Sequence, residues 1–468
     1  MCAPSSSMAT LDDTPAMKRQ RSAFDASAPP TGEPTLARRL GPFDATMIVM
    51  GGIIGAGIFV NPSVVARQVH TPGLVLGAWA TGGAIALVGA FVYAELAARR
   101  PNVGGQYAYL RDAYHPIVAF LYGWTLLLVV QTGGMAGAAI VFGRYFRELT
   151  GFTGSEQMVA AATLALLTAI NCLGVRAGSN VQNALMVTKL AAIALLIGVG
   201  LFVASPPSVA AAATESSGGA VGLATAMVPV LFAYGGWQTA SFVSGEMRNP
   251  TRDLPRGLLI GVVGVIALYL TVTYVCLHVL GIDALAATTT PASEVMRRAL
   301  GDRGARLIAL GIALSTVGFL SQSILTAPRV YYAMARDGVF FSAVGKLDAR
   351  SRAPVVAIVL QGVWAAVIAM TGRYEQILNY VVSIDVLFFG LTGAALFIFR
   401  RREPAPEGAV RVPVHPLSTA VFVLACWAIS LTTIVRYPGN AGIGVGILLV
   451  GAVVFRFWKK GPREPSLS

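Results

Sequence analysis

Two apolar stretches of this chain contain clustered glycines at points where a membrane helix should be continuous. Residues 51–59 read GGIIGAGIF, and residues 232–237 read FAYGGW. Glycine destabilises a helix interior, and the backbone N–H and C=O groups that it frees survive in hydrocarbon only where they line a cavity or bind a ligand. Broken helices at corresponding positions of two halves of a chain are typical of transporters, which bind their substrate near the middle of the bilayer.

The two breaks offer opposite hydrogen-bonding groups. Free N–H groups of residues 55–57 would lie at the start of a half-helix, where the helix dipole also favours an anion such as a carboxylate. Unwound carbonyls near Gly235 could accept hydrogen bonds from an ammonium group, with Phe232 as a lid and Trp237 beside it. A zwitterionic α-amino acid carries both groups. A glycine seam for close helix packing would also explain the first break, and Phe232 could be ordinary packing or lipid contact.

Lys189 lies in the middle of an apolar stretch, where inserting an ammonium group costs on the order of 3 kcal/mol or more. It could couple transport to protons, because burial makes deprotonation of a lysine feasible. It could instead be a fixed cation that donates hydrogen bonds to the broken first helix. Snorkelling to an interface is a third explanation, which its central position disfavours.

Membrane helices must hold these residues. Of 468 residues, 55% are hydrophobic and 12% are charged, against roughly 25% charged in a soluble domain. A hydrocarbon core about 30 Å thick requires about 20 apolar residues per helix, and the sequence contains twelve such stretches. The predicted spans are residues 43–69, 73–98, 114–142, 158–174, 181–204, 220–246, 256–280, 304–332, 354–371, 375–399, 416–435 and 441–458.

The basic residues flank these spans unevenly and predict an orientation. Sorted by side, they satisfy the positive-inside rule when both termini are cytoplasmic. Because they flank helices and form no single patch, the net charge of +13 does not predict nucleic-acid binding. Residues 1–40 contain no apolar core, so we interpret them as a disordered cytoplasmic tail and not as a signal peptide. Residues 459–468 form the second cytoplasmic tail. We expect a multi-pass protein of the cell (plasma or inner) membrane.

The breaks fall in the first and sixth spans and divide ten helices into two sets of five. Residues 41–204 hold spans one to five, and residues 220–399 hold spans six to ten. An odd number of helices per unit reverses the second unit in the membrane, which predicts an inverted repeat. The last two spans, within residues 415–458, lie outside this repeat. The predicted fold class is an all-α integral membrane protein with twelve transmembrane helices.

The remaining ionisable residues indicate no second chemistry. Asp44, Glu95 and Glu246 fall near predicted cytoplasmic ends, where they could close an inner gate, pair with Arg99, Arg248 or Arg252, or be plain interfacial charges. Asp385 in the tenth span lies deeper and could face the bundle, but the sequence names no partner for it. The four cysteines lack metal-ligand spacing. We expect no metal and no cofactor, and no constellation of side chains supports an enzyme.

Several motifs together resemble one known family. They comprise residues 52–60 (GIIGAGIFV), 93–96 (YAEL), 104–109 (GGQYAY), 232–237 (FAYGGW) and 329–338, with Glu246-Met247, Asn249-Pro250 and Leu254-Pro255-Arg256. Through these motifs, residues 41–400 resemble the amino acid–polyamine–organocation (APC) superfamily, and within it the L-type amino acid transporter branch.

The resemblance implies a five-plus-five inverted repeat, often called the LeuT fold, with discontinuous helices 1 and 6. It also implies the site. Backbone N–H groups of Gly55, Ala56 and Gly57 would hold the substrate carboxylate, carbonyls of Ile53, Phe232 and Gly235 would hold the ammonium, and Phe232 would act as a gate.

Two further implications concern coupling and partners. A lysine at the position of Lys189 is typical of the family and implies sodium-independent transport. Serine is frequent in the family where this chain has Ala56, so we expect a change in affinity and not loss of the site.

Mammalian-type members are joined by a disulfide to an ancillary glycoprotein through a cysteine between spans three and four. Residues 143–154 contain no cysteine, so no disulfide-linked ancillary subunit is expected, as in prokaryotic members.

The sequence therefore predicts sodium-independent transport of neutral L-amino acids by alternating access, as an exchanger. Proton-coupled symport of amino acids, including cationic amino acids or polyamines, stays an alternative, because selectivity depends on the tertiary placement of residues such as Trp237 and Gln238. A membrane amino-acid sensor, which would bind its ligand without moving it, is a hypothesis of a different class. The short tails give it no signalling domain.

Overall fold

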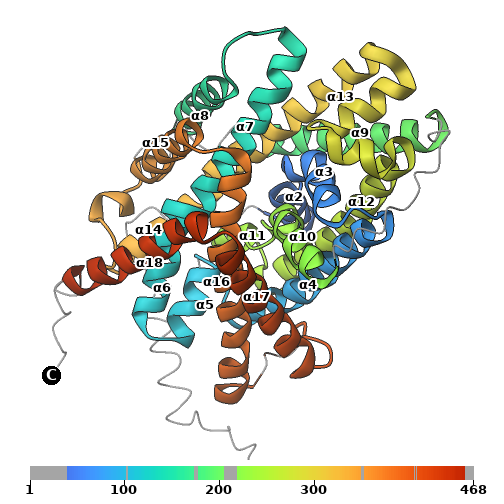
Figure 1. Cartoon of the computed structure of the whole chain (residues 1–468). Coiled ribbons are helices and arrows are strands. Elements are labelled where there is room, and N and C mark those ends of the chain that lie inside the picture. Colours follow the sequence, from blue (N-terminus) through green and yellow to red (C-terminus); the bar gives the residue numbers. More distant parts are fainter. Residues whose placement is uncertain are drawn as a thin grey trace, which may run out of the picture. The chain divides into compact units, whose positions relative to one another are not determined.

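The chain folds into helices throughout the part that the computed structural model describes (Figure 1). That part comprises residues 40–101, 104–172, 178–204, 219–348, 353–404, 406 and 408–458. Apart from Leu40, both predicted tails lie outside it. The elements are α2 (Pro42–Ile53), α3 (Gly57–Val69), α4 (Pro72–Arg99), α5 (Gln106–Ala113), α6 (Pro116–Thr125), the π-helical segment η1 (Leu126–Val130), α7 (Gln131–Thr150), α8 (Glu156–Cys172), α9 (Gly178–Phe202), α10 (Gly219–Tyr234), α11 (Thr239–Phe242), η3 (Ser244–Glu246), α12 (Pro250–Ala287), α13 (Pro291–Thr326), α14 (Pro328–Arg336), η4 (Ser342–Gly345), α15 (Val355–Thr371), α16 (Tyr374–Arg402), α17 (Leu417–Arg436) and α18 (Pro438–Trp458).

Proline marks where many of these helices begin. The first residue of α2, α4, α6, α12, α13, α14 and α18 is a proline. The first N–H groups of a helix have no partner within the helix, so proline costs no hydrogen bond there, and its fixed φ suits the first turn. The long apolar stretches are thus divided into helices by residues that the sequence already displays.

Each of the twelve predicted spans overlaps a helix, and nine of them meet the requirements of a membrane span. Within the described residues, eight helices are long and apolar enough to cross a membrane, and the bent pair α2–α3 makes a ninth. The other three predicted spans coincide with shorter apolar helices, namely α8, α15 and Val221–Tyr234 of α10. The chain is therefore an all-helical protein with eight or nine helices that meet the requirements of a membrane span.

Both predicted breaks are present. Helices α2 and α3 are bent by 40° at the residues between them, where Ile54 has a ψ of 84° and is not helical. Helix α10 ends at Tyr234 and α11 begins at Thr239, and Gly236 between them has a φ of 111°, in the left-handed region that favours glycine.

The broken pair α2–α3 lies inside a ring of longer helices. Helix α2 contacts α9, α12 and α13, and α3 contacts α10 and α12, as the blue, green and yellow ribbons in the centre and right of Figure 1 show. Helix α16 contacts α7 and α10 from the other side. The two breaks are therefore enclosed by α7, α13 and α16.

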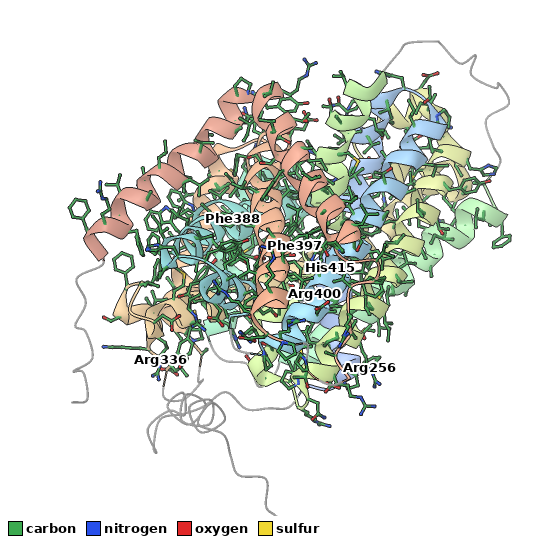
Figure 2. All side chains as sticks on the ribbon, turned by 90° about the horizontal axis from the view of Figure 1, so that it is seen from below. Arg256, Arg336, Phe388, Phe397, Arg400 and His415 are labelled. Carbon is green, nitrogen blue, oxygen red and sulfur yellow. The ribbon has the colours of Figure 1, made fainter. Side chains whose placement is uncertain are left out.

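One end of the helices, which we call the basic end, is held together by buried ion pairs. Glu95 at the end of α4 has 0% of its surface exposed. Its carboxylate accepts hydrogen bonds from Arg99 (3.0 Å), Arg400 (2.6 Å) and the N–H of Val412 (2.8 Å). Figure 2 shows Arg400 beside His415, where α16 meets the segment before α17. A buried carboxylate is stable there because all its partners are charged or polar donors.

The other two carboxylates that the sequence places at this end also have partners. Glu246 pairs with Arg329 at 3.1 Å, on α14, and not with the neighbouring arginines that the sequence suggested. Asp44 accepts from the N–H of Gly41 at 2.9 Å and so caps the start of α2. Among the ion pairs of the described residues, the pair of Glu95 with Arg99 is the only one of the predicted pairings.

Candidate functional site

A cavity lies where the two broken helices meet. A single water needs roughly 10–15 Å³ for its centre, and the cavity offers about 80 Å³ by that measure. It therefore has room for several water-sized groups, which suits a small organic ligand. Its walls are Gly52, Ile53, Gly55, Ala56, Gly57, Val130, Gln131, Gly134, Ala138, Leu231, Phe232, Ala233, Gly235, Gly236, Gln238, Thr239, Phe319, Ser323, Val381, Val382, Asp385 and Val386.

At the first break, the backbone of Gly55, Ala56 and Gly57 lines this cavity. The N–H of Gly55 turns back to the carbonyl of Ile53 at 2.8 Å. Ala56 and Gly57 are at the start of α3 and line the cavity, and no backbone acceptor is present for their N–H groups among the described residues. The start of a helix carries a partial positive charge. The chain therefore presents two free donors and a favourable dipole at one side of the cavity.

At the second break, a carbonyl loses its helical partner. In a continuous helix the N–H of Gly236 would donate to the carbonyl of Phe232. Here it donates to Oε1 of Gln238 at 2.9 Å. The last helical bond of α10 runs from Gly235 N to Leu231 O at 2.8 Å. The carbonyl oxygen of Phe232, in the cavity wall, is thereby left as a free acceptor.

A tyrosine hydroxyl joins the two breaks. Oη of Tyr269 on α12 lies 2.9 Å from the carbonyl oxygen of Ile53 and 3.2 Å from that of Ala233. The carbonyl oxygen of Ile53 therefore already accepts from two donors, Tyr269 and Gly55. Sequence reasoning missed Tyr269, although a tyrosine in the middle of an apolar span is a signal, because its buried hydroxyl needs a partner.

Lys189 lies behind the first break and outside the cavity wall. It comes from α9, has 1% of its surface exposed, and its Nζ donates to the carbonyl oxygens of Gly51, at 3.4 Å, and Ile54. These are carbonyls that the bend leaves without helical partners. The ammonium group therefore compensates the negative end of α2.

Phe232 and its neighbours close the cavity at the end opposite to the basic end. The ring of Phe232 contacts Tyr374 edge to face, with 6.3 Å between ring centres. The hydroxyl of Tyr374 donates to Oδ1 of Asn61 at 3.0 Å, and Nδ2 of Asn61 donates to the carbonyl of Pro229 at 2.7 Å. This chain of contacts joins α16, α3 and α10 above the cavity.

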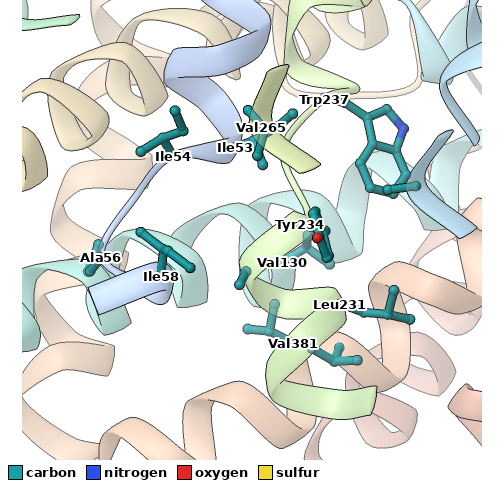
Figure 3. Packing of buried hydrophobic residues seen from close by; sticks show 14 of the residues in the cluster. Ile53, Ile54, Ala56, Ile58, Val130, Leu231, Tyr234, Trp237, Val265 and Val381 are labelled. Carbon is teal, nitrogen blue, oxygen red and sulfur yellow. The ribbon is translucent and has the colours of Figure 1, made fainter. Parts of the chain in front are cut away.

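Trp237 is not in the cavity wall. Its ring packs against Phe389 and Tyr93, with ring centres 4.8 Å and 6.4 Å apart. Figure 3 shows it pointing away from the first break at Ala56. The structure thus brings together six of the seven predicted binding residues, Ile53, Gly55, Ala56, Gly57, Phe232 and Gly235, and leaves Trp237 behind them.

Among the described residues that line the cavity, one has an ionisable side chain. Asp385 on α16 is partly accessible from it. Among the described residues it has no hydrogen bond or ion pair. Its Oδ2 lies 3.9 Å from the position that a Cβ on Gly235 would occupy. The sequence indicated that Asp385 could face the bundle, and it faces this cavity.

The fold and the cavity define a class of protein: a polytopic helical membrane protein with a cavity between two broken helices. Comparison with known families identifies it further. Residues 40–455 match the amino acid permease family, and the chain belongs to that family, within the APC superfamily. It is therefore a multi-pass amino acid transporter of the membrane and not an enzyme.

The chain is similar over most of its length to curated transporters. It is 30% identical to the large neutral amino acids transporter small subunit 2 of Homo sapiens over 453 residues, 92% of this chain and 83% of that protein. It is 28% identical to the b(0,+)-type amino acid transporter 1 of Mus musculus, over 90% of this chain and 88% of that protein. It is also 28% identical to the serine/threonine exchanger SteT of Bacillus subtilis (strain 168), over 91% of this chain and 98% of that protein.

Proposed function

We propose that this transporter exchanges neutral L-amino acids across the membrane by alternating access and without sodium. The observation that carries the proposal is the pairing of free N–H groups at Ala56 and Gly57 with a free carbonyl at Phe232, in the walls of one cavity. An α-amino acid presents a carboxylate and an ammonium at a fixed short separation. A ligand with both charges matches both walls.

The carboxylate is held at the start of α3. Ala56 and Gly57 contribute their N–H groups, and Gly55 contributes the space that a side chain would block. The missing hydroxyl at Ala56 leaves these backbone donors in place. The ammonium is held by the carbonyls of Phe232 and Gly235, while Ile53 supports the wall through its bond to Tyr269.

Lys189 supports sodium independence. Its ammonium donates to carbonyls of α2 that a sodium ion could otherwise coordinate. A second cation at the same oxygens would be repelled at short range by a charge that water does not screen. Lys189 therefore organises the first break as a fixed positive charge.

The proposal includes the membrane arrangement. The chain has twelve transmembrane helices. Ten of them form a five-plus-five inverted repeat with the LeuT fold, and two follow it. Membership of the family supports this arrangement. The repeat units are residues 41–204 and 220–399. The basic end, with Arg329 and Arg400, faces the cytoplasm of the cell membrane together with both termini.

Exchange of neutral substrates is supported by the relatives. One relative is named a serine/threonine exchanger and another a transporter of large neutral amino acids. The cavity walls of this chain are mostly apolar, with Val130, Val381 and Phe319 among them, which suits an uncharged side chain. The segment between α7 and α8 has no cysteine, so the proposed transporter works without a disulfide-linked subunit.

The test is uptake of radiolabelled amino acids by the purified chain in liposomes. We expect uptake only when the liposomes contain unlabelled amino acid, at equal rates in sodium and potassium buffers. If an inward proton gradient drives uptake into liposomes that contain no amino acid, this result would contradict exchange and support proton symport. Binding without any flux would support a sensor.

A further inference from the structure

Asp385 is the one charged residue among the described residues of the cavity wall, and its surroundings leave its charge uncompensated. No ion pair or hydrogen bond to it is present in the described part of the chain. A carboxylate enclosed by protein is costly unless a cation or several donors contact it. A ligand that occupies the cavity is the group available to supply that positive charge.

The ammonium end of the cavity lacks one acceptor. An ammonium group has three N–H donors when its nitrogen carries one carbon substituent. Of the three carbonyls that the sequence assigned to it, that of Ile53 already accepts from Gly55 and Tyr269. The carbonyls of Phe232 and Gly235 remain, which leaves one donor of the substrate without a partner.

Asp385 stands where that third acceptor is needed. The position of a Cβ on Gly235 is 3.4 Å from the carbonyl oxygen of Phe232 and 3.9 Å from Oδ2 of Asp385. The Phe232 carbonyl oxygen and the Asp385 carboxylate therefore lie near the same point beside Gly235, and all three residues line the cavity. Because Gly235 has no side chain, an ammonium group in the cavity can approach both oxygens.

We propose that Asp385 is a substrate-binding residue that forms an ion pair with the α-ammonium group of the amino acid. This inference rests on the proposed function. It adds that Asp385 determines which end of the substrate faces α16. The carboxylate of the substrate lies at the start of α3, and its ammonium lies between Phe232, Gly235 and Asp385. The ion pair forms with every α-amino acid, whatever its side chain.

The inference predicts a particular pattern of losses in Asp385→Asn. The amide keeps the size of the side chain and loses the charge. A charge-assisted hydrogen bond is worth roughly twice a neutral one, so we expect KM for L-alanine, L-serine and L-leucine to rise by about 10- to 100-fold, and by a similar factor for each. Glu375→Gln removes another carboxylate from α16, one that pairs with Arg67 outside the cavity, and we expect its KM to stay within about twofold of wild type.

A second readout separates binding of the ammonium from a general loss of structure. L-Lactate has the methyl and carboxylate groups of L-alanine with a hydroxyl in place of the ammonium. The wild-type chain should be inhibited far more strongly by L-alanine than by L-lactate, and Asp385→Asn should narrow this ratio by about tenfold. Asp385→Glu, which restores the charge, should recover part of the ratio. If Asp385→Asn is poorly folded, Asp385→Ser, which also removes the charge, is compared with wild type by the stabilisation that L-alanine and L-lactate give to the detergent-purified proteins.

Several results would overturn the inference. The first is an unchanged KM for neutral amino acids in Asp385→Asn. The second is a rise in KM for L-lysine or L-ornithine alone, which would mean that Asp385 binds the substrate side chain. The third is transport that no longer depends on a proton gradient while KM stays constant, which would mean that Asp385 binds a proton. If the wild-type chain itself transports no amino acid, the proposed function fails first. If it does and Asp385→Asn behaves like wild type, only this inference fails.

Discussion

Gly52 and Gly236 approach each other so closely that neither position has room for a side chain. A Cβ on Gly52 would lie 2.7 Å from the carbonyl oxygen of Gly236, and a Cβ on Gly236 would overlap the carbonyl oxygen of Gly52. Gly52 lies in the last turn of α2, and Gly236 lies in the second break. Their contact brings the free N–H groups of one break and the free carbonyl of the other into one cavity.

Gly236→Ala should destabilise the transporter. The substitution creates a backbone clash and forces alanine into the left-handed region, which alone costs about 1–2 kcal/mol. We expect the melting temperature of the detergent-purified protein to fall by several degrees and transport to be lost. Gly77→Ala is the control, because a Cβ on Gly77 of α4 meets no atom within 4 Å and alanine favours a helix. Equal melting temperatures for the two variants would mean that the contact at Gly52 is not tight.

Tyr269→Phe should weaken substrate binding while it keeps the ring packing. The ring of Tyr269 contacts Tyr234 and Trp79 through its faces and edges, and these contacts survive the loss of the hydroxyl. The carbonyls of Ile53 and Ala233 lose a donor, which costs about 1 kcal/mol. We expect KM to rise about fivefold. Tyr274→Phe, on the same helix but 47% exposed, serves as the control. A KM that moves equally in both variants would argue against a bridge between the breaks.

The helices and their breaks could be predicted from the sequence because membrane spans leave strong local signals. Twenty apolar residues, a proline at a helix start and a glycine cluster each act on the chain next to them. For that reason the positions of α2, α3, α10 and α16 agree with the predicted spans. The backbone groups at Ala56, Gly57 and Phe232 follow directly from the breaks.

Contacts between distant residues could not be predicted in the same way. Tyr269 is 216 residues from Ile53 in the sequence, and nothing beside either residue marks the other as its partner. Trp237 follows the second break directly, yet the turn at Gly236 directs its ring toward Phe389 on α16. The sequence predicts where Asp385 lies along its helix, but it does not predict which residues lie next to it. The fold brings Asp385 close to Gly235.

Lys189→Met should abolish most transport without unfolding the chain. Methionine fills the volume of the lysine stem, but the carbonyls of Gly51 and Ile54 lose a charged donor worth about 1.5–3 kcal/mol. We expect the first break to lose its geometry and the maximal rate to fall by at least about tenfold. Lys346→Met removes an exposed lysine and should transport normally. Full sodium-independent transport by Lys189→Met would remove the role proposed for Lys189.

Gly55→Val should remove substrate binding at the carboxylate end. A Cβ on Gly55 already lies 3.2 Å from the ring of Phe319, and the two methyl groups of valine extend from it into the cavity. The N–H groups of Ala56 and Gly57 remain, but the approach of a carboxylate to them is blocked. We expect no stabilisation of the detergent-purified variant by L-alanine at concentrations that saturate the wild type.

The control for Gly55→Val is Gly134→Ala, on α7 in the wall of the same cavity, where a Cβ meets no atom within 4 Å. This variant should still bind L-alanine, because a single methyl group at this position leaves both breaks untouched. Substrate affinity that is unchanged in Gly55→Val would count against the whole site, since Gly55 lies beside the two N–H groups proposed to hold the carboxylate. If Gly55→Val loses binding and Gly134→Ala keeps it, the amino acid is recognised by the backbone of the first break. The glycines of residues 51–57 leave this backbone accessible because they have no side chains.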